Sequence, residues 1–152
     1  MIIVKEGNLF NTTAPIIAHQ VNCQGVMGSG VAKQIKDRYP DCFTAYKNSV
    51  EKSHALLGDI CWWTNGKVSI ANMFAQYKYG YDKKKYTCVK SFKDCVDLLK
   101  SAAVKSSRNV AMPYNIGCCR GGADWNTEIY PILEEAFKDA PITLELWRLD
   151  DK

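Results

Sequence analysis

The chain alternates between short apolar runs and longer amphipathic stretches from one end to the other. The amphipathic stretches place apolar side chains three and four residues apart, the spacing of one helix face. The run PIIAHQV is mostly apolar on both sides, which is typical of a central strand covered on both faces. We predict strands over residues 1–4, 15–21, 58–64, 67–74, 109–112 and 142–149, and helices over residues 31–39, 41–53, 87–105 and 124–138. Strands and helices that interleave in this way predict an α/β fold, a three-layer α/β/α domain with a mixed central sheet.

Local signals indicate where several of these elements begin and end. Pro40 stops the first helix, because proline cannot continue it. Asn65-Gly66 between two strand-like runs is the strongest short signal for a β-hairpin. Thr87 and Asp124 are placed to cap the helices that follow them, since a side-chain oxygen there can accept from a free backbone N–H.

Composition is that of an ordinary globular domain, with 152 residues, 47% hydrophobic and 24% charged. We expect one domain over residues 1–152, which buries ~70% of the surface of its unfolded chain without disulfides. No apolar run approaches the ~18 residues that span a bilayer. The first residues also lack the basic and apolar regions of a signal peptide. We therefore expect a cytoplasmic protein with no membrane partner.

The formal net charge of +4 is a mild basic excess, weaker than most nucleic-acid-binding domains show. A dense basic run is formed by Lys83, Lys84 and Lys85. It is either a solvated loop or a contact with polyphosphate or nucleic acid. Nucleic acid is not the partner that we expect. The seven cysteines form no C-x-x-C pair and there are only two histidines, so we expect no metal site and no cofactor. The sequence does not predict an oligomeric state.

Two glycine-rich loops each follow a predicted strand and precede a predicted helix. They are residues 22–31, NCQGVMGSGV, and residues 113–122, PYNIGCCRGG. Ligands of α/β sheets bind beyond the carboxyl ends of the strands, and glycines let backbone amides approach them closely. The pair of loops predicts a clamp for a diphosphate at a helix N-terminus. The order of glycines in the first loop differs from G-x-G-x-x-G, and no Walker motif occurs, so a classical dehydrogenase or P-loop ATPase is not indicated.

These loops and their neighbours resemble a macro domain, the fold that binds ADP-ribose. The resemblance runs nearly end to end and is closest to the compact single-domain branch, which contains ADP-ribose 1''-phosphate phosphatases and ADP-ribosyl hydrolases. It is carried by Lys5-Glu6-Gly7-Asn8-Leu9, residues 17–32 (IAHQVNCQGVMGSGVA), residues 71–76 (ANMFAQ), residues 112–118 (MPYNIGC) and Asp124-Trp125.

The resemblance implies a set of ligand-binding residues. Asn8, followed by Leu9, stands where the family usually has an acidic residue for the adenine amino group, and an amide oxygen can still accept from it. Cys119 and Arg120 stand where glycine and a small or apolar residue are usual. Arg120 reaches either a phosphate or solvent. The loops around the diphosphate comprise Met27, Gly28, Ser29, Gly30 and Val31 in the first, and Ile116, Gly117, Cys118, Cys119, Arg120 and Gly121 in the second.

The resemblance also implies catalytic candidates. Asn22 would hold the distal ribose or an attacking water, or else cap its own loop, and His19 would support it from inside the strand. Gln76 stands where some relatives carry a catalytic lysine, and Gly121 where some carry an aspartate. A lysine nucleophile is therefore not indicated, and direct attack by a positioned water is the remaining route.

We accordingly expect a hydrolase that binds ADP-ribose or a derivative, with ADP-ribose 1''-phosphate as the leading substrate. A binding module without chemistry is the first alternative, because the lysine and aspartate positions have changed. A hydrolase of ADP-ribosylated protein or DNA is the second.

Overall fold

The computed structural model describes residues 1–28, 30–54, 56–80, 84–118 and 121–149. Its centre is a six-stranded sheet in the order β1-β6-β5-β2-β4-β3. All neighbouring strands are parallel except β3 and β4, which are antiparallel, so the sheet is mixed as predicted. The strands are β1 (Ile2–Glu6), β2 (Ile16–Asn22), β3 (Ile60–Thr64), β4 (Ser69–Gln76), β5 (Val110–Pro113) and β6 (Leu144–Arg148).

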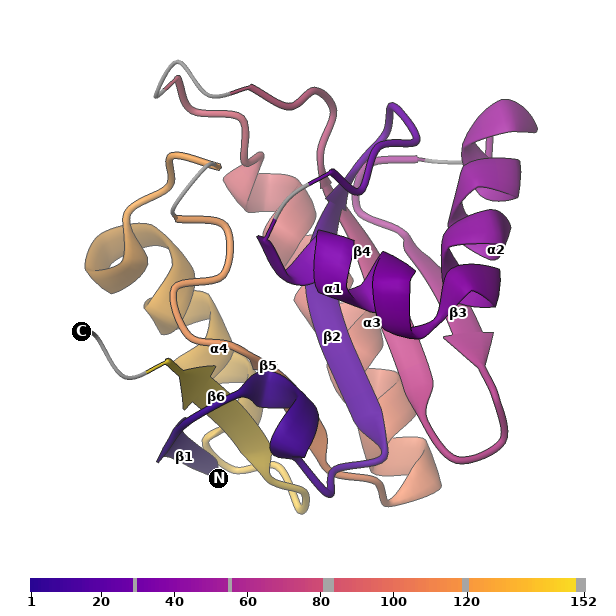
Figure 1. Cartoon of the computed structure of the whole chain (residues 1–152). Helices are drawn as coiled ribbons and strands as arrows, with labels where there is room; N and C mark the ends of the chain where they lie inside the picture. The colour runs from indigo at the N-terminus through magenta and orange to yellow at the C-terminus, as the bar shows by residue number, and fades with distance from the viewer. Residues whose placement is uncertain (29, 55, 81–83, 119–120, 150–152) are drawn as a thin grey trace.

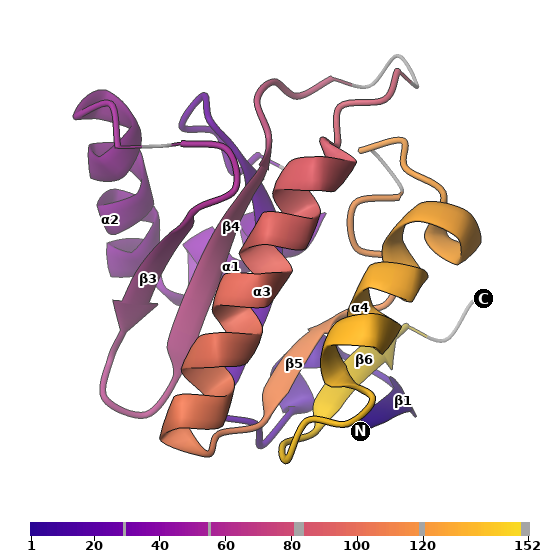
Figure 2. The same cartoon turned by 180° about the vertical axis from the view of Figure 1, so that it is seen from behind.

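Helices cover both faces of the sheet. Figure 1 shows α1 and α2 in front of it, and Figure 2 shows α3 and α4 on the opposite face. This arrangement confirms the three-layer α/β/α fold. The helices are α1 (Gly30–Arg38), α2 (Pro40–Glu51), α3 (Val89–Ser106) and α4 (Tyr130–Phe137), with a 3-10 turn η1 (Leu9–Asn11) and a π-helical turn η2 (Trp125–Ile129).

The central strand β2 supplies the core on both sides. Ile16 and Ala18 pack into the cluster under α3 and α4, whereas Ile17 and Val21 pack into the clusters under α1 and α2. This alternation follows from the two-residue period of a strand. The apolar run that predicted a doubly covered strand is confirmed.

The signals for element boundaries are confirmed with one exception. Asp124 caps η2 by accepting from the N–H of Thr127. Asn65 closes the hairpin between β3 and β4 by accepting from two N–H groups in the loop. Pro40 occupies the first turn of α2, where no helical N–H is needed. Thr87 is not a helix cap, because α3 begins one residue later than expected for one, behind Cys88. Its hydroxyl donates instead to the carbonyl of Gly117.

We also searched the described residues for membrane-spanning helices and for clusters of metal ligands. No helix within them has the length and apolar character needed to cross a membrane. Nor do any three of their His, Cys, Asp and Glu side chains gather where they could hold a metal ion.

Candidate functional site

A cavity of about 600 Å³ lies at the carboxyl ends of five strands, β1, β6, β5, β2 and β4. Adjacent strands are ~4.8 Å apart, so the cavity extends over ~19 Å of the sheet edge. Both glycine-rich loops contribute to its wall. The connections after β2, β4 and β5 leave the sheet at this same edge, and those after β2 and β4 lie near the top of Figure 1. The position and volume suit a small organic ligand.

Asn22 shapes the first loop at the end of β2. Its Oδ1 accepts from the N–H of Gln24 at 2.9 Å and from the hydroxyl of Tyr46 at 2.8 Å. Its Nδ2 donates to the carbonyl of Val26 at 2.9 Å. Asn22 also lines the cavity, so one side chain both holds the loop and faces the ligand space.

The glycines of the first loop leave backbone exposed to the cavity. Gly28, Gly30 and Val31 line the wall. Gly30 has a φ of +61°, which L side chains rarely adopt, and no atom lies within 4 Å of where a Cβ would stand. Met27, which we expected to line the pocket, is not among the lining residues that the structure describes. Its side chain packs in the core, because an apolar side chain beside the glycines turns inward. Ser29 lies outside the described residues.

His19 is buried in β2, and its protonation is fixed by a neighbour. Its Nε2 lies 2.5 Å from Oδ1 of Asn72, and the Asn72 Nδ2 donates to the carbonyl of Cys61. Asn72 therefore presents its oxygen, and Nε2 must carry the proton. Burial lowers the pKa of His19 to about 4, so the ring is neutral at pH 7. Its Nδ1 is a buried acceptor without a hydrogen-bond partner among the described residues, in a side chain that lines the cavity.

Gln76 is anchored by its neighbours at the end of β4. Its Oε1 accepts from Nε2 of Gln20 at 2.7 Å, and its own Nε2 donates to the carbonyl of Lys78 at 2.8 Å. The Gln20 Nε2 also donates to the hydroxyl of Thr87 at 2.8 Å. Gln20 and Gln76 both line the cavity. The sequence reasoning missed Gln20, although its place in the central strand beside His19 was visible.

The second loop is packed tightly against the segment that precedes α3. The N–H groups of Tyr86 and Thr87 both donate to the carbonyl of Gly121. A Cβ on Gly121 would lie 2.1 Å from the Thr87 hydroxyl and 2.4 Å from the Gly117 carbonyl oxygen. Only glycine fits this position. Ile116, Gly117, Cys118 and Gly121 line the cavity, whereas Cys119 and Arg120 fall outside the part of the chain that the structure describes.

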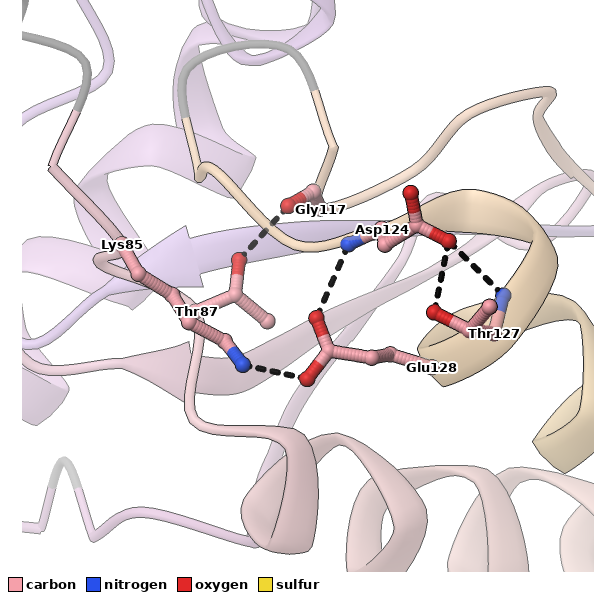
Figure 3. A network of polar contacts seen from close by, with 6 residues as sticks. All are labelled: Lys85, Thr87, Gly117, Asp124, Thr127 and Glu128. Atoms are coloured by element: carbon pink, nitrogen blue, oxygen red, sulfur yellow. Dashed lines mark hydrogen bonds and ion pairs between the residues drawn. The ribbon is translucent and has the colours of Figure 1, made fainter.

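A polar network holds this segment to η2, as Figure 3 shows. Lys85 forms an ion pair with Glu128, whose other oxygen accepts from the N–H of Asp124 at 2.9 Å. The bond from Lys85 holds the pKa of Glu128 below its usual range, and bonds from Thr127 do the same for Asp124. One lysine of the basic run thus has a structural contact, and Lys83 lies outside the described residues.

The opposite end of the cavity, over β1, β6 and β5, is largely aromatic and apolar. Phe10, Tyr114 and Trp147 line it together with Asn8 and Leu9. The Asn8 Oδ1 accepts from the N–H of Phe10 at 2.9 Å and caps η1, so the oxygen expected to meet adenine is engaged by the backbone. The sequence reasoning missed Trp147, since a residue of the last strand reaches the site only through the β1–β6 pairing.

The described part of the cavity wall carries few charged side chains. The described residues that line the cavity include no lysine, aspartate or glutamate, and one cation, Arg148. The Arg148 guanidinium lies 5.0 Å from the centre of the Tyr114 ring and also pairs with Glu6. Such a wall does not repel a polyanionic ligand.

Sequence and structure comparisons give a consistent result. The Macro domain family profile matches residues 18–129. A DNA ADP-ribosyl glycohydrolase of Mycobacterium tuberculosis is 30% identical over 93% of this chain and 40% of its own length. An ADP-ribose 1''-phosphate phosphatase of Neosartorya fischeri is 43% identical, but over 28% of this chain and 22% of its own length. The chain thus spans well under half the length of these curated relatives.

The fold agrees with these relationships. The macrodomain of Mycobacterium tuberculosis DarG superposes with a TM-score of 0.85 and 25% identity, covering 99% of each chain. The matched residues 18–129 contain the first glycine-rich loop, β4 and the second glycine-rich loop, and this range supplies most of the residues that line the cavity. This chain belongs to the macro domain family.

Proposed function

We propose that this macro domain binds ADP-ribose and hydrolyses a group from the distal ribose, with ADP-ribose 1''-phosphate as the substrate. The side chains at the two ends of the cavity support one orientation of the ligand. The aromatic end suits the base, and the backbone amides of the two loops suit the diphosphate. The distal ribose then reaches the polar end over β2 and β4, beside Asn22, His19 and Gln76.

The charge of the cavity wall is the observation that favours a phosphate ester as the substrate. Among the described lining residues there is no carboxylate to repel a third phosphate group. There is equally no lysine there to act as a nucleophile on the ribose carbon. The reaction that we propose is attack of water on phosphorus, with cleavage of the bond between phosphorus and the ribose oxygen, giving ADP-ribose and inorganic phosphate.

His19 and Asn22 have different parts in this proposal. The unpartnered Nδ1 of the neutral His19 is an acceptor that orders a water or a ribose hydroxyl. Asn22 holds the loop with its oxygen and keeps one N–H of Nδ2 for the ribose or the water. Gln76 fixes Gln20 and the end of β4 rather than reacting.

A second candidate is removal of ADP-ribose from DNA. The observation that favours it is the 30% identity to DNA ADP-ribosyl glycohydrolases over 93% of this chain, whereas the phosphatase matches cover a short segment. Gln76, in the place of the lysine that such relatives carry, argues against it.

One experiment separates these possibilities. The protein is incubated with ADP-ribose 1''-phosphate, acetylated ADP-ribose, ADP-ribosylated peptide and ADP-ribosylated DNA, and the products are followed by mass spectrometry. We expect release of phosphate from the first substrate, and binding of ADP-ribose by calorimetry with a dissociation constant on the order of micromolar. Release of ADP-ribose from DNA alone would favour the second candidate. Binding without any turnover would make the chain a binding module.

A further inference from the structure

The carboxamide of Asn8 is held in one orientation by the backbone. Its Oδ1 accepts from the N–H of Phe10 at 2.9 Å. Because an N–H can be met only by an acceptor, the oxygen and not the nitrogen of the amide faces Phe10. The Nδ2 group is therefore turned away from the turn, and it has no partner among the described residues.

Asn8 lines the cavity at its aromatic end, beside Phe10, Tyr114 and Trp147. A flat heterocycle gains most from this end, because aromatic side chains bury its faces. The phosphates of the same ligand belong with the backbone amides of the glycine loops, between this end and the polar end over β2 and β4. A purine in this position brings its polar edge within reach of the Asn8 side chain.

We infer that Asn8 sets the choice of base, and that this site accepts a 6-oxopurine nucleoside diphosphate ribose, with hypoxanthine or guanine, at least as well as ADP-ribose. The inference rests on the proposed function, since it assigns a base to the same cavity. The Nδ2 group donates hydrogen bonds, and position 6 of hypoxanthine or guanine is a carbonyl that accepts them. Position 6 of adenine is an amino group, so a donor would face a donor and both would lose their water partners.

An aspartate at this position would have the opposite preference. One carboxylate oxygen would accept from Phe10, as Oδ1 does now, and the second would accept from the adenine amino group. Both residues are good N-caps, so Asn8→Asp keeps the turn. The added negative charge weakens binding of every diphosphate, but this effect is the same for two ligands that differ only in the base.

The hairpin loop offers a matched control. Asn65 accepts from the N–H groups of Lys67 and Val68, each at 2.9 Å, and it is not part of the cavity wall. It lies in the loop that precedes β4, whereas the cavity lies at the carboxyl end of that strand. Asn65→Asp therefore introduces the same charge into a similar turn, away from the ligand.

The test is calorimetric titration of the whole chain with ADP-ribose and with inosine diphosphate ribose. We expect the parent protein and Asn65→Asp to bind the inosine compound at least as tightly as ADP-ribose. We expect Asn8→Asp to shift the ratio of the two dissociation constants about tenfold in favour of ADP-ribose.

The outcomes are distinguishable from failure of the proposed function. A parent protein that binds neither nucleotide would overturn the proposed function itself. A parent protein that binds ADP-ribose but binds the inosine compound tenfold more weakly would overturn only the role of Asn8. The same ratio of dissociation constants in Asn8→Asp as in the parent would also overturn it.

Discussion

The hydroxyl of Thr87 donates a hydrogen bond of 2.8 Å to the carbonyl of Gly117, across 30 residues of sequence. The same oxygen accepts from Nε2 of Gln20 in the central strand. One hydroxyl thus joins β2, the segment before α3 and the second glycine-rich loop. The part of the cavity wall formed by the second glycine-rich loop therefore depends on a residue that does not itself line the cavity.

We expect Thr87→Val to weaken both stability and ligand binding. The variant keeps the shape of the side chain but removes one hydrogen bond from the Gly117 carbonyl, which keeps the Ala123 N–H, and one from the Gln20 amide, which keeps Gln76. The free energy of unfolding should fall by ~1–3 kcal/mol, and ADP-ribose affinity should fall several-fold as the loop loosens. Thr44→Val is the matched control, because within the described part of the chain the Thr44 hydroxyl bonds to the Pro40 carbonyl alone, on an exposed helix surface. Urea denaturation and calorimetry check both variants, and equal effects in the two would contradict the bridging role of Thr87.

Two glycine substitutions should separate folding from binding. At Gly28 a Cβ would meet only the Val26 side chain, at 3.6 Å, so Gly28→Ala should fold normally. Its methyl group stands at the cavity wall, so ADP-ribose affinity should fall about tenfold. At Gly121 a Cβ would collide with Gly117 and Thr87, so Gly121→Ala should lower the melting temperature by several degrees. Normal affinity in a folded Gly28→Ala variant would show that the first loop does not approach the ligand.

Much of the fold follows from local pattern, whereas the detailed contacts do not. Hydrophobic spacing predicted the six strands and four helices of the described residues, because apolar side chains recur along each at the period of its secondary structure. The role of Thr87 could not be predicted, since its partner Gly117 belongs to a loop whose position depends on the whole sheet. The burial of Met27 was likewise invisible, because a loop residue has no periodicity to indicate its direction.

The candidate site was likewise predicted only in part from the sequence. The glycine loops and Asn22 were found from motif and position, and the lining of the cavity agrees with most of them. The pairing of His19 with Asn72 requires the register between β2 and β4, which the sequence does not state. The place of Trp147 in the site could be predicted only by knowing that β6 lies between β1 and β5.

We expect His19 to make the protein less stable as the pH falls. Its pKa is near 6.5 in an unfolded chain and about 4 in the fold, where burial disfavours the charged ring. Between these two values the unfolded chain binds more protons, so the free energy of unfolding decreases on acidification, by about 2 kcal/mol from pH 7 to pH 5. The carboxyl groups of Asp124 and Glu128 have lowered pKa values, so they add to this loss only at more acidic pH.

The measurement is urea denaturation at pH 7 and pH 5. His19→Gln should remove most of the pH dependence in this interval, whatever its effect on absolute stability. His54→Gln, the other histidine, should retain it. A parent protein with equal stability at both pH values would show that His19 is not buried as a neutral ring.

Borohydride should trap no adduct between the protein and any ADP-ribosylated substrate. Trapping needs an amine at the reacting carbon, and the described lining residues include no lysine, while Gln76 fills the position that a lysine holds in some relatives. Mass spectrometry of the intact protein after borohydride treatment checks this. The Lys78→Ala variant, treated with ADP-ribose in the same way, is the comparison sample. A mass shift that disappears in Lys78→Ala would identify that lysine as a nucleophile and exclude attack by water alone.

Asn22 should contribute more to turnover than to binding, and Tyr46 provides the comparison. Both residues stabilise the first loop, since the Tyr46 hydroxyl donates to the carboxamide of Asn22, but only Asn22 lines the cavity. Tyr46→Phe therefore reports the cost of loosening the loop. We expect it to lower kcat for ADP-ribose 1''-phosphate less than tenfold, whereas Asn22→Ala should lower it ~10²–10³-fold, the usual loss of one preorganised polar group. Both variants should bind ADP-ribose within several-fold of each other, because the glycine loops keep the diphosphate. Equal losses of kcat in the two variants would mean that Asn22 acts only by shaping its loop.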